Sequence, residues 1–213
     1  MKTDEWIGVL AASAAEDLQP RVEPRVVRAA VVGLAGAAVL MLTFFGVRPD
    51  LVQTLALPMF WGKLAFAAAL AVPCLWAVLR LARPGAKALP AAGWIAMPVA
   101  VIWGLGGWEL WQQPASLRMP MVLGTTWRTC PFNIALLAVP ALLAGLWALR
   151  GGAPTRPGWA GAGAGLLAGA LAALVYALHC PEMAAPFLAV WYVVGIAIPT
   201  ALGALLGARW LRW

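Results

Sequence analysis

The sequence predicts an all-α, polytopic membrane protein: a bundle of six transmembrane helices with cytoplasmic N- and C-termini. Composition is the first reason, because 63% of the 213 residues are hydrophobic and only 11% are charged, whereas about 25% are charged in an average soluble domain. So much apolar surface cannot be hidden in one aqueous core and must face lipid. The other two reasons are the long uncharged runs along the chain and the uneven distribution of Lys and Arg between them.

Six uncharged runs are long enough, or nearly long enough, to cross a membrane, since a helix needs roughly 20 apolar residues to span about 30 Å of hydrocarbon. We expect one helix from each of these runs: 29–47, 64–79, 88–108, 129–149, 157–181 and 183–208. The second run is short, and it reaches the required length if Lys63 snorkels outward at one end and the helix continues past Arg80 at the other. Residues 1–28 then form a cytoplasmic N-terminal segment, and residues 29–213 form the transmembrane domain.

Lys and Arg side chains indicate the orientation, because positively charged short connections stay in the cytoplasm. With the N-terminus inside, the inner connections hold 11 of the 15 Lys and Arg residues. The other four are Arg48, Lys63, Arg118 and Arg128. Because six is an even number of spans, both termini are expected to be cytoplasmic.

Groups that catalyse reactions or relay protons are nearly absent from the predicted spans. Glu109 and Glu182 fall at the outer edge, His179 falls at the end of the fifth span, and the only serines are Ser13 and Ser116. No Ser/His/Asp set, H-E-x-x-H motif or glycine-rich phosphate loop can be assembled from these residues. We therefore expect a protein that is not an enzyme.

The three cysteines differ in their surroundings. Cys74 lies mid-span in an apolar stretch, where we expect it to act as a small buried hydrophobe. Cys130 lies in Thr-Cys-Pro-Phe at the start of the fourth span, and Cys180 lies in His-Cys-Pro-Glu at the end of the fifth. The topology puts Cys130 and Cys180 at the same outer depth, so the two side chains can meet although 50 residues separate them.

Two interpretations of this cysteine pair stay open. A constitutive disulfide would brace two helices in an oxidising compartment. Alternatively, a periplasmic thiol pair would bind a soft metal ion or be oxidised, with Glu182 or His179 as further ligands. Pro131 favours a reactive Cys130, because a proline as first residue of the fourth helix places Cys130 at its cap, where the helix dipole stabilises a thiolate.

Residues 1–20 predict a short amphipathic helix. Asp4 and Glu5 suit its first turn, and apolar side chains recur along one side at near-helical spacing: Trp6, Ile7, Leu10, Ala14 and Leu18. Such a helix can lie on the membrane or dock into a groove of a basic cytoplasmic protein. Its acidic polar face suits an anionic bilayer poorly, so docking is favoured. The candidate contacts with that protein are Asp4, Trp6, Ile7 and Leu10.

Glycines at G-x-x-x-G spacing allow helix backbones to approach closely. They occur in the fifth and sixth spans, at Gly161, Gly165, Gly169, Gly203 and Gly207. Packing within the bundle is favoured over a dimer face, and the oligomeric state stays open.

Short motifs in a characteristic order run along the whole chain. They are Met-Lys-Thr-Asp-Glu-Trp-Ile at 1–7, Phe-Trp-Gly-Lys-Leu at 60–64, Arg-Pro-Gly at 83–85, Trp-x-x-Cys at 127–130, Ala-Pro at 153–154, Cys-Pro-Glu at 180–182, Trp-Tyr at 191–192 and Leu-Arg-Trp at 211–213. In this order, with two outer cysteines across six spans, the chain resembles the NrsF-type membrane anti-sigma factors of proteobacteria. That family consists of negative regulators of extracytoplasmic-function (ECF) sigma-F factors.

The resemblance implies a regulator that holds an ECF sigma factor at the bacterial inner membrane and frees it under heavy-metal or oxidative stress. In the family the two periplasmic cysteines are the sensing residues, and they correspond here to Cys130 and Cys180. The implied ligand is a heavy-metal ion that binds these sulfurs transiently, and no resident cofactor is expected. The family's cytoplasmic segment corresponds to residues 1–20, the candidate contact with the sigma factor, and no direct contact with nucleic acid is expected.

Two other functions remain as alternatives. A membrane thiol–disulfide oxidoreductase also uses periplasmic cysteines on a small helical bundle, but it requires a second cysteine pair to relay electrons. A small-molecule or metal transporter requires ligands inside the membrane, which the predicted spans lack. The sequence leaves open which signal acts, which sigma factor is bound and whether its release needs proteolysis.

Overall fold

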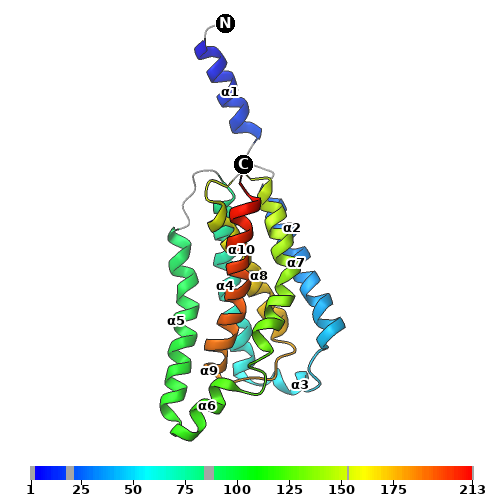
Figure 1. The fold of residues 1–213 in the computed structure, drawn as a ribbon, viewed down its shortest axis with the longest axis vertical. Coiled ribbons are helices and arrows are strands. Elements are labelled where there is room, and N and C mark those ends of the chain that lie inside the picture. The colour runs from blue at the N-terminus through cyan, green and yellow to red at the C-terminus, as the bar shows by residue number, and fades with distance from the viewer. Residues whose placement is uncertain (1–2, 18–21, 84–88, 153, 213) are drawn as a thin grey trace.

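The computed structural model describes residues 3–17, 22–83, 89–152 and 154–212, without the side chains of 13–17 and 89–91, and all the regular elements within these residues are helical (Figure 1). Some positions used above lie outside this description. They are Leu18 and the Ala14 side chain of the predicted amphipathic face, the start of the predicted third span at Ala88, and residues 1, 2, 84, 85, 153 and 213 of the motifs.

The helices follow one another with short connections. The N-terminal helix α1 (Thr3–Asp17) precedes α2 (Val22–Leu40), which continues as a π-helical turn, η1 (Met41–Phe45). Next come α3 (Leu51–Thr54), α4 (Pro58–Leu81), α5 (Leu89–Gln112) and α6 (Ala115–Leu123). They are followed by α7 (Cys130–Arg150) and α8 (Pro157–Tyr176). The last helix consists of α9 (Ala185–Phe187), the π-helical turn η2 (Leu188–Tyr192) and α10 (Val193–Trp210).

Five helices among the described residues are long and apolar enough to cross a membrane. They are Val22–Phe45, Pro58–Leu81, Cys130–Arg150, Pro157–Tyr176 and Ala185–Trp210. The predicted all-helical membrane class is therefore confirmed, and these five helices correspond to five of the six predicted spans. The predicted third span corresponds to α5, which is not one of the five, so six crossings stay a prediction.

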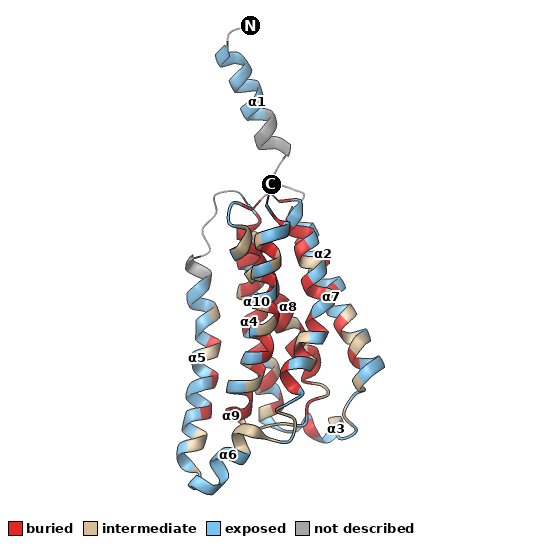
Figure 2. Cartoon of the chain, in the orientation of Figure 1, coloured by how far each residue is buried: buried red, intermediate tan, exposed pale blue. Residues whose placement is uncertain are grey.

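The α5 helix lies at the edge of the bundle and is mostly exposed (Figure 2). Two hydrogen bonds tie it to the last helix, because the Trp103 indole N–H donates to the Ala189 carbonyl at 2.8 Å and the Ala185 N–H donates to the Glu109 carboxylate at 2.9 Å. Trp94 and Trp108 are among its large side chains that face outward. An exposed apolar helix of this kind is suited to contact with lipid.

The α8 helix lies at the centre of the bundle. In its most apolar 18-residue window 61% of the residues are buried, against 28% for the first candidate span. Gly161 and Gly165 let α10 approach so closely that an added Cβ would collide with backbone atoms of Gly203 and Pro199. The glycines therefore serve packing within the bundle, as the sequence favoured.

Replacing Gly165 by Val should destabilise the bundle more than a typical overpacked core, for which the cost is about 1–3 kcal/mol. The reason is that the new Cβ would meet the Pro199 carbonyl, a backbone atom that cannot rotate away. Thermal unfolding in detergent measures the effect, and Gly104→Val in α5 is the matched control because nothing lies within 4 Å of an added Cβ there. Equal unfolding midpoints for the two variants would contradict the packing argument.

The predicted ends of two spans are corrected. The first helix begins at Val22 and not at residue 29, so Arg25 and Arg28 lie inside it. The fifth ends at Tyr176 and not at residue 181, because the N–H groups of Leu178 and His179 bond to carbonyls three residues back, and Pro181 has no N–H with which to continue a helix. Cys180 therefore lies in a loop, which we call loop 177–184.

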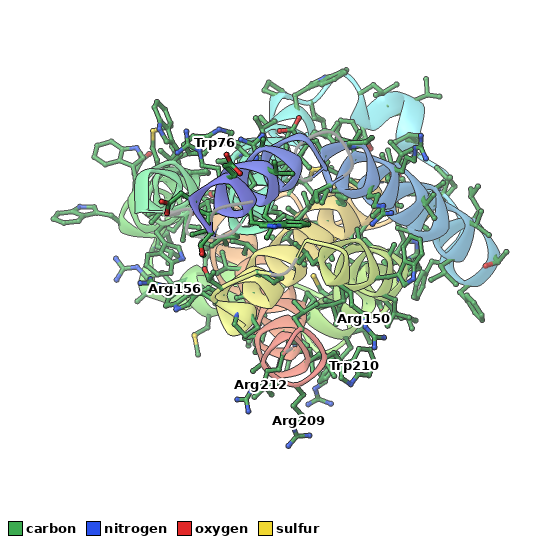
Figure 3. All side chains as sticks on the ribbon, turned by 90° about the horizontal axis from the view of Figure 1, so that it is seen from above. Trp76, Arg150, Arg156, Arg209, Trp210 and Arg212 are labelled. Carbon is green, nitrogen blue, oxygen red and sulfur yellow. The ribbon has the colours of Figure 1, made fainter. Side chains whose placement is uncertain are left out.

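The two ends of the bundle differ in charge. We call the end at which α2 begins and α10 ends the terminal end, and the opposite end, where α7 begins, the cysteine end (Figure 1). Figure 3 looks onto the terminal end, where it labels Arg150, Arg156, Arg209 and Arg212 together with Trp76 and Trp210. The Arg80 guanidinium stacks there over Trp76, 4.4 Å from the ring centroid. Arg and Trp side chains of this kind are typical of a membrane boundary.

Candidate functional site

Cys130 and Cys180 meet at the cysteine end of the bundle. Cys130 is the first residue of α7 and Cys180 lies in loop 177–184, yet both side chains are completely buried. Both are free thiols, and they lie close enough to each other for their charges to interact. The predicted encounter of these residues is confirmed, while their role as sensors stays a prediction. Cys74 is also a free, buried thiol, in the apolar interior of α4.

The structure corrects the position of Cys130 relative to the cap of the fourth predicted helix and shows what surrounds Cys180. Cys130 is not the N-cap but the first residue inside the helix, after Thr129 at the N-cap. In loop 177–184, by contrast, the pKa of Cys180 is lowered, first by the interaction with Cys130 and then by the nearby positive charge of Lys63. These two effects exceed the desolvation that burial imposes on the Cys180 thiolate. The surroundings of Cys180 therefore favour its thiolate form.

Lys63 is the buried cation beside the cysteine pair. It is 0% exposed, and its ammonium donates to the carbonyls of Cys180 at 3.0 Å and of Glu182 at 2.7 Å. The ring of Tyr192 lies 5.6 Å from the same nitrogen. The expectation that Lys63 snorkels outward is wrong, because two carbonyls and an aromatic face solvate its charge inside the bundle. The α4 helix gains its length by beginning at Pro58 instead.

Arg48 holds the same loop from the segment that follows the first span. Its guanidinium donates to the Cys180 carbonyl at 3.2 Å, and its backbone N–H donates to the Leu178 carbonyl at 3.2 Å. Two further donors reach the Asp50 carboxylate at 2.7 Å each, in a bidentate ion pair. The hydrogen bond with Arg48 lowers the pKa of Asp50, and the same hydrogen bond raises the pKa of Arg48. The Cys180 carbonyl thus accepts from two cations.

Glu182 and His179 are engaged elsewhere and are not ligands beside the sulfurs. One Glu182 carboxylate oxygen accepts from the backbone N–H groups of Thr125 at 2.7 Å and of Thr126 at 3.1 Å, and from both threonine hydroxyls. The His179 ring lies 3.0 Å from the Gly46 carbonyl. In the part of the chain that the structure describes, no group of three or more His, Cys, Asp or Glu is placed to hold a metal ion. In this arrangement neither Glu182 nor His179 supplies a third ligand beside the sulfurs.

Two tyrosines complete the walls around the sulfurs. The Tyr176 hydroxyl accepts from the Asn133 amide at 3.3 Å and lies near the Cys130 thiol. The Tyr192 ring lies 6.0 Å from the Tyr176 ring, and its hydroxyl is fully buried without an ordinary hydrogen-bond partner while it interacts with the Cys180 sulfur. The pair is thus enclosed by polar groups that can respond to a change in the charge of a thiol.

Sequence reasoning missed Lys63, Arg48, Tyr176 and Tyr192 as parts of this site. One signal could have found Lys63, because an ionisable residue inside an apolar helix is a functional candidate by default. The tyrosines carry no such signal, since aromatic residues near a helix end are also typical of the membrane boundary.

The N-terminal helix α1 presents the predicted contact residues to solvent. Trp6, Ile7 and Leu10 are 52%, 59% and 61% exposed, and Asp4 is exposed as well. Figure 1 shows α1 beyond the terminal end of the bundle, opposite the cysteine pair. Large apolar side chains left exposed on a helix outside the bundle are suited to a protein partner.

The fold and this site define an α-helical membrane protein with a buried thiol pair at one end and an exposed helix at the other. A family model described as "NrsF: Negative regulator of sigma F" matches residues 10–213. The chain is 47% identical to the "Probable anti-sigma-F factor NrsF" of Azospira oryzae and 39% identical to the "Anti-sigma-F factor NrsF" of Caulobacter vibrioides, in each case over 100% of both chains. The chain therefore belongs to the NrsF family. No solved structure matches it.

The family match covers the whole membrane bundle but only part of α1. It begins at residue 10, so it includes Leu10 and leaves out Asp4, Trp6 and Ile7. The two relatives align over the full chain, which includes these three positions.

Proposed function

We propose that this chain is an anti-sigma factor that holds an ECF sigma factor at the bacterial inner membrane and releases it when a heavy metal or an oxidant acts on Cys130 and Cys180. The observation that carries the proposal is the contact between these two buried thiols at the end of the bundle opposite α1. Family membership supports the regulatory role, since both relatives are named as anti-sigma-F factors.

The chain crosses the membrane six times, with α5 as the third crossing. An even number of crossings is supported by the position of both the start of α2 and the end of α10 at the terminal end. Five helices qualify by length and hydropathy, and the 24 residues of α5 extend about 36 Å at 1.5 Å per residue, enough to cross the hydrocarbon. The basic terminal end faces the cytoplasm, as positively charged connections do, and the cysteine end faces the periplasm.

The sigma factor binds α1 on the cytoplasmic side. Trp6, Ile7 and Leu10 supply the apolar anchors, and Asp4 supplies a charge for a basic rim around the partner's groove. This contact requires no nucleic acid. Because α1 precedes α2 by only four residues that the structure does not describe, a shift of α2 in the membrane changes where α1 is presented.

The signal acts on two sulfurs without a third acidic or imidazole ligand. A soft metal ion binds thiolates preferentially, and the two thiolates supply two of its ligands. An oxidant instead takes two protons and two electrons from the thiols and leaves a disulfide. Either change joins the start of α7 to loop 177–184, and this loop is hydrogen-bonded to Arg48 and Lys63 near the ends of the first two spans.

Cadmium should release the sigma factor from membranes that contain this chain, whereas magnesium should not. The reason is that Cd²⁺ is a soft ion that thiolates bind, and Mg²⁺ is a hard ion that prefers oxygen ligands. The measurement is the fraction of sigma factor that sediments with membranes after each addition, with the thiol oxidant diamide as a third condition. A sigma factor that never sediments, or that stays bound under all three conditions, would overturn the proposed function.

A thiol–disulfide oxidoreductase is less well supported than this regulator. The sequence has three cysteines, and the one outside the pair, Cys74, is buried in the interior of α4. A relay of electrons through a second cysteine pair is therefore impossible within one chain.

A further inference from the structure

Lys63 is a charged side chain buried inside the bundle. It lies in the second turn of an apolar helix of 24 residues and is 0% exposed, as fully buried as the two cysteines. A buried ammonium destabilises a membrane protein unless other groups replace its water, and such residues mark functional positions by default. The groups that replace water around this ammonium therefore indicate what Lys63 does.

The contacts of Lys63 all lie on one short segment. Its ammonium donates to the carbonyls of Cys180 and Glu182, at 3.0 and 2.7 Å, which are the carbonyls on either side of Pro181. Arg48 donates to the Cys180 carbonyl from another direction at 3.2 Å. The backbone that carries the Cys180 sulfur is therefore held by donors from two separate parts of the chain.

Hydrogen bonds also connect loop 177–184 and the residue after it to the segment before α7 and to the end of α5. The Glu182 carboxylate accepts from Thr125 and Thr126 ahead of α7, and the residue after the loop, Ala185, donates to Glu109 at the end of α5. The position of the Cys180 sulfur relative to Cys130 thus depends on how this loop sits over the bundle. Among the charged side chains of the described residues that hold this loop, Lys63 is the fully buried one.

We propose that Lys63 is the positioning residue of the cysteine pair: it clamps the Cys180–Pro181–Glu182 backbone against α4 and thereby keeps the Cys180 sulfur within bonding reach of Cys130. This proposal rests on the proposed function for what the pair senses, but the geometry of the clamp stands apart from it. Without the ammonium, the two carbonyls lose their donor and the segment moves away from Cys130. The sulfurs then no longer close readily on one metal ion or form a disulfide.

The test is the rate at which the two sulfurs cross-link in membranes that contain the full-length chain. Diamide oxidises two neighbouring thiols to a disulfide and takes up the two protons and two electrons, and loss of labelling by a maleimide-polymer reports the bond on a gel. A Cys74→Ala background removes the third thiol. Lys63→Met has a similar length but no donor, and we expect it to slow cross-linking by about tenfold to a hundredfold, the loss typical of reacting atoms displaced by about 1 Å.

Two further variants separate positioning from general stability. Lys63→Arg keeps the charge and the donors, and we expect it to restore the rate to within about threefold of the unmodified chain, since a donor is again available to both carbonyls. Lys63→Gln keeps two neutral donors on a shorter side chain and serves if Lys63→Met does not fold, with slowed cross-linking again expected. Arg118→Met is the control, because Arg118 is an exposed base that donates to the Gln113 carbonyl, away from the cysteines.

Each outcome decides a different point. An unmodified chain that does not cross-link would overturn the cysteine pairing and with it the proposed function. An unmodified chain that cross-links, together with folded Lys63→Met or Lys63→Gln variants that cross-link equally fast, would overturn the role of Lys63 alone. The positioning role would also be overturned if the slowing only parallels a lower thermal unfolding midpoint and Lys63→Arg does not reverse it.

Discussion

Replacing either Cys130 or Cys180 by Ser is expected to abolish induction of the sigma-dependent genes by heavy metal and by oxidant. The sigma factor should then stay bound, so the genes remain at their uninduced level. A serine hydroxyl neither binds soft metals nor forms a disulfide, so it removes both ways of joining α7 to loop 177–184. A metal bridge or a disulfide between α7 and loop 177–184 needs both sulfurs, so loss of one should have the same effect as loss of both.

The size of this effect follows from what a switch requires. Moving a two-state equilibrium from 1:99 to 99:1 takes about 5.5 kcal/mol of differential binding. A soft metal ion bound by two thiolates can supply this differential binding free energy. One thiolate beside a serine hydroxyl is not expected to supply it. Reporter-gene induction measured over a range of cadmium concentrations tests the prediction. Cys74→Ala is the matched control, since it removes a buried thiol inside α4 that is not part of the pair, and an unchanged response in both serine variants would refute the sensing proposal.

Charged substitutions on the apolar side of α1 should produce the opposite phenotype, constant expression of the same genes without any signal. Trp6→Glu and Leu10→Glu place carboxylates where the proposed partner groove is apolar. Anchor residues of this kind typically contribute about 2 kcal/mol or more each, so each substitution should weaken sigma binding by roughly thirtyfold. Both side chains are more than half exposed, so the bundle itself should be unaffected.

The control for α1 is Ala12→Glu, which adds the same charge on the opposite side of the helix. Positions 6 and 10 share one face of an α-helix, while position 12 points away from it, and Ala12 is exposed like them. Co-purification of the sigma factor with the full-length chain measures binding for all three variants. Equal loss with Ala12→Glu would show a non-specific effect of charge, and full retention by Trp6→Glu and Leu10→Glu would place the partner contact elsewhere.

Charge and hydropathy in the sequence were enough to predict the class of protein and most of its helices. The fourth predicted span, 129–149, agrees with α7 to within one residue at each end, because hydrophobic length is a local property that the sequence states directly. The meeting of Cys130 and Cys180 was also predictable, since topology alone places both at the same end of the bundle.

The end of the fifth helix was not predictable from hydropathy. Uncharged residues continue to 181, but the helix ends at Tyr176, where two tight turns lead into Pro181. Hydropathy cannot distinguish an apolar loop packed inside protein from a continuing helix. That difference moves Cys180 from a helix end into a loop, which gives its backbone carbonyl the freedom to accept from Lys63 and Arg48.

By itself, the sequence determined a membrane bundle, its basic and cysteine-bearing ends, and an N-terminal helix with exposed apolar side chains. Only the tertiary structure decided that Lys63 turns inward, that Glu182 bonds to Thr125 and Thr126, and that the Cys180 carbonyl accepts from both Lys63 and Arg48. The physical reason is sequence separation. Hydrophobicity and charge act along neighbouring residues, whereas a hydrogen bond between Lys63 and Glu182 joins residues 119 positions apart and exists only once the helices have packed.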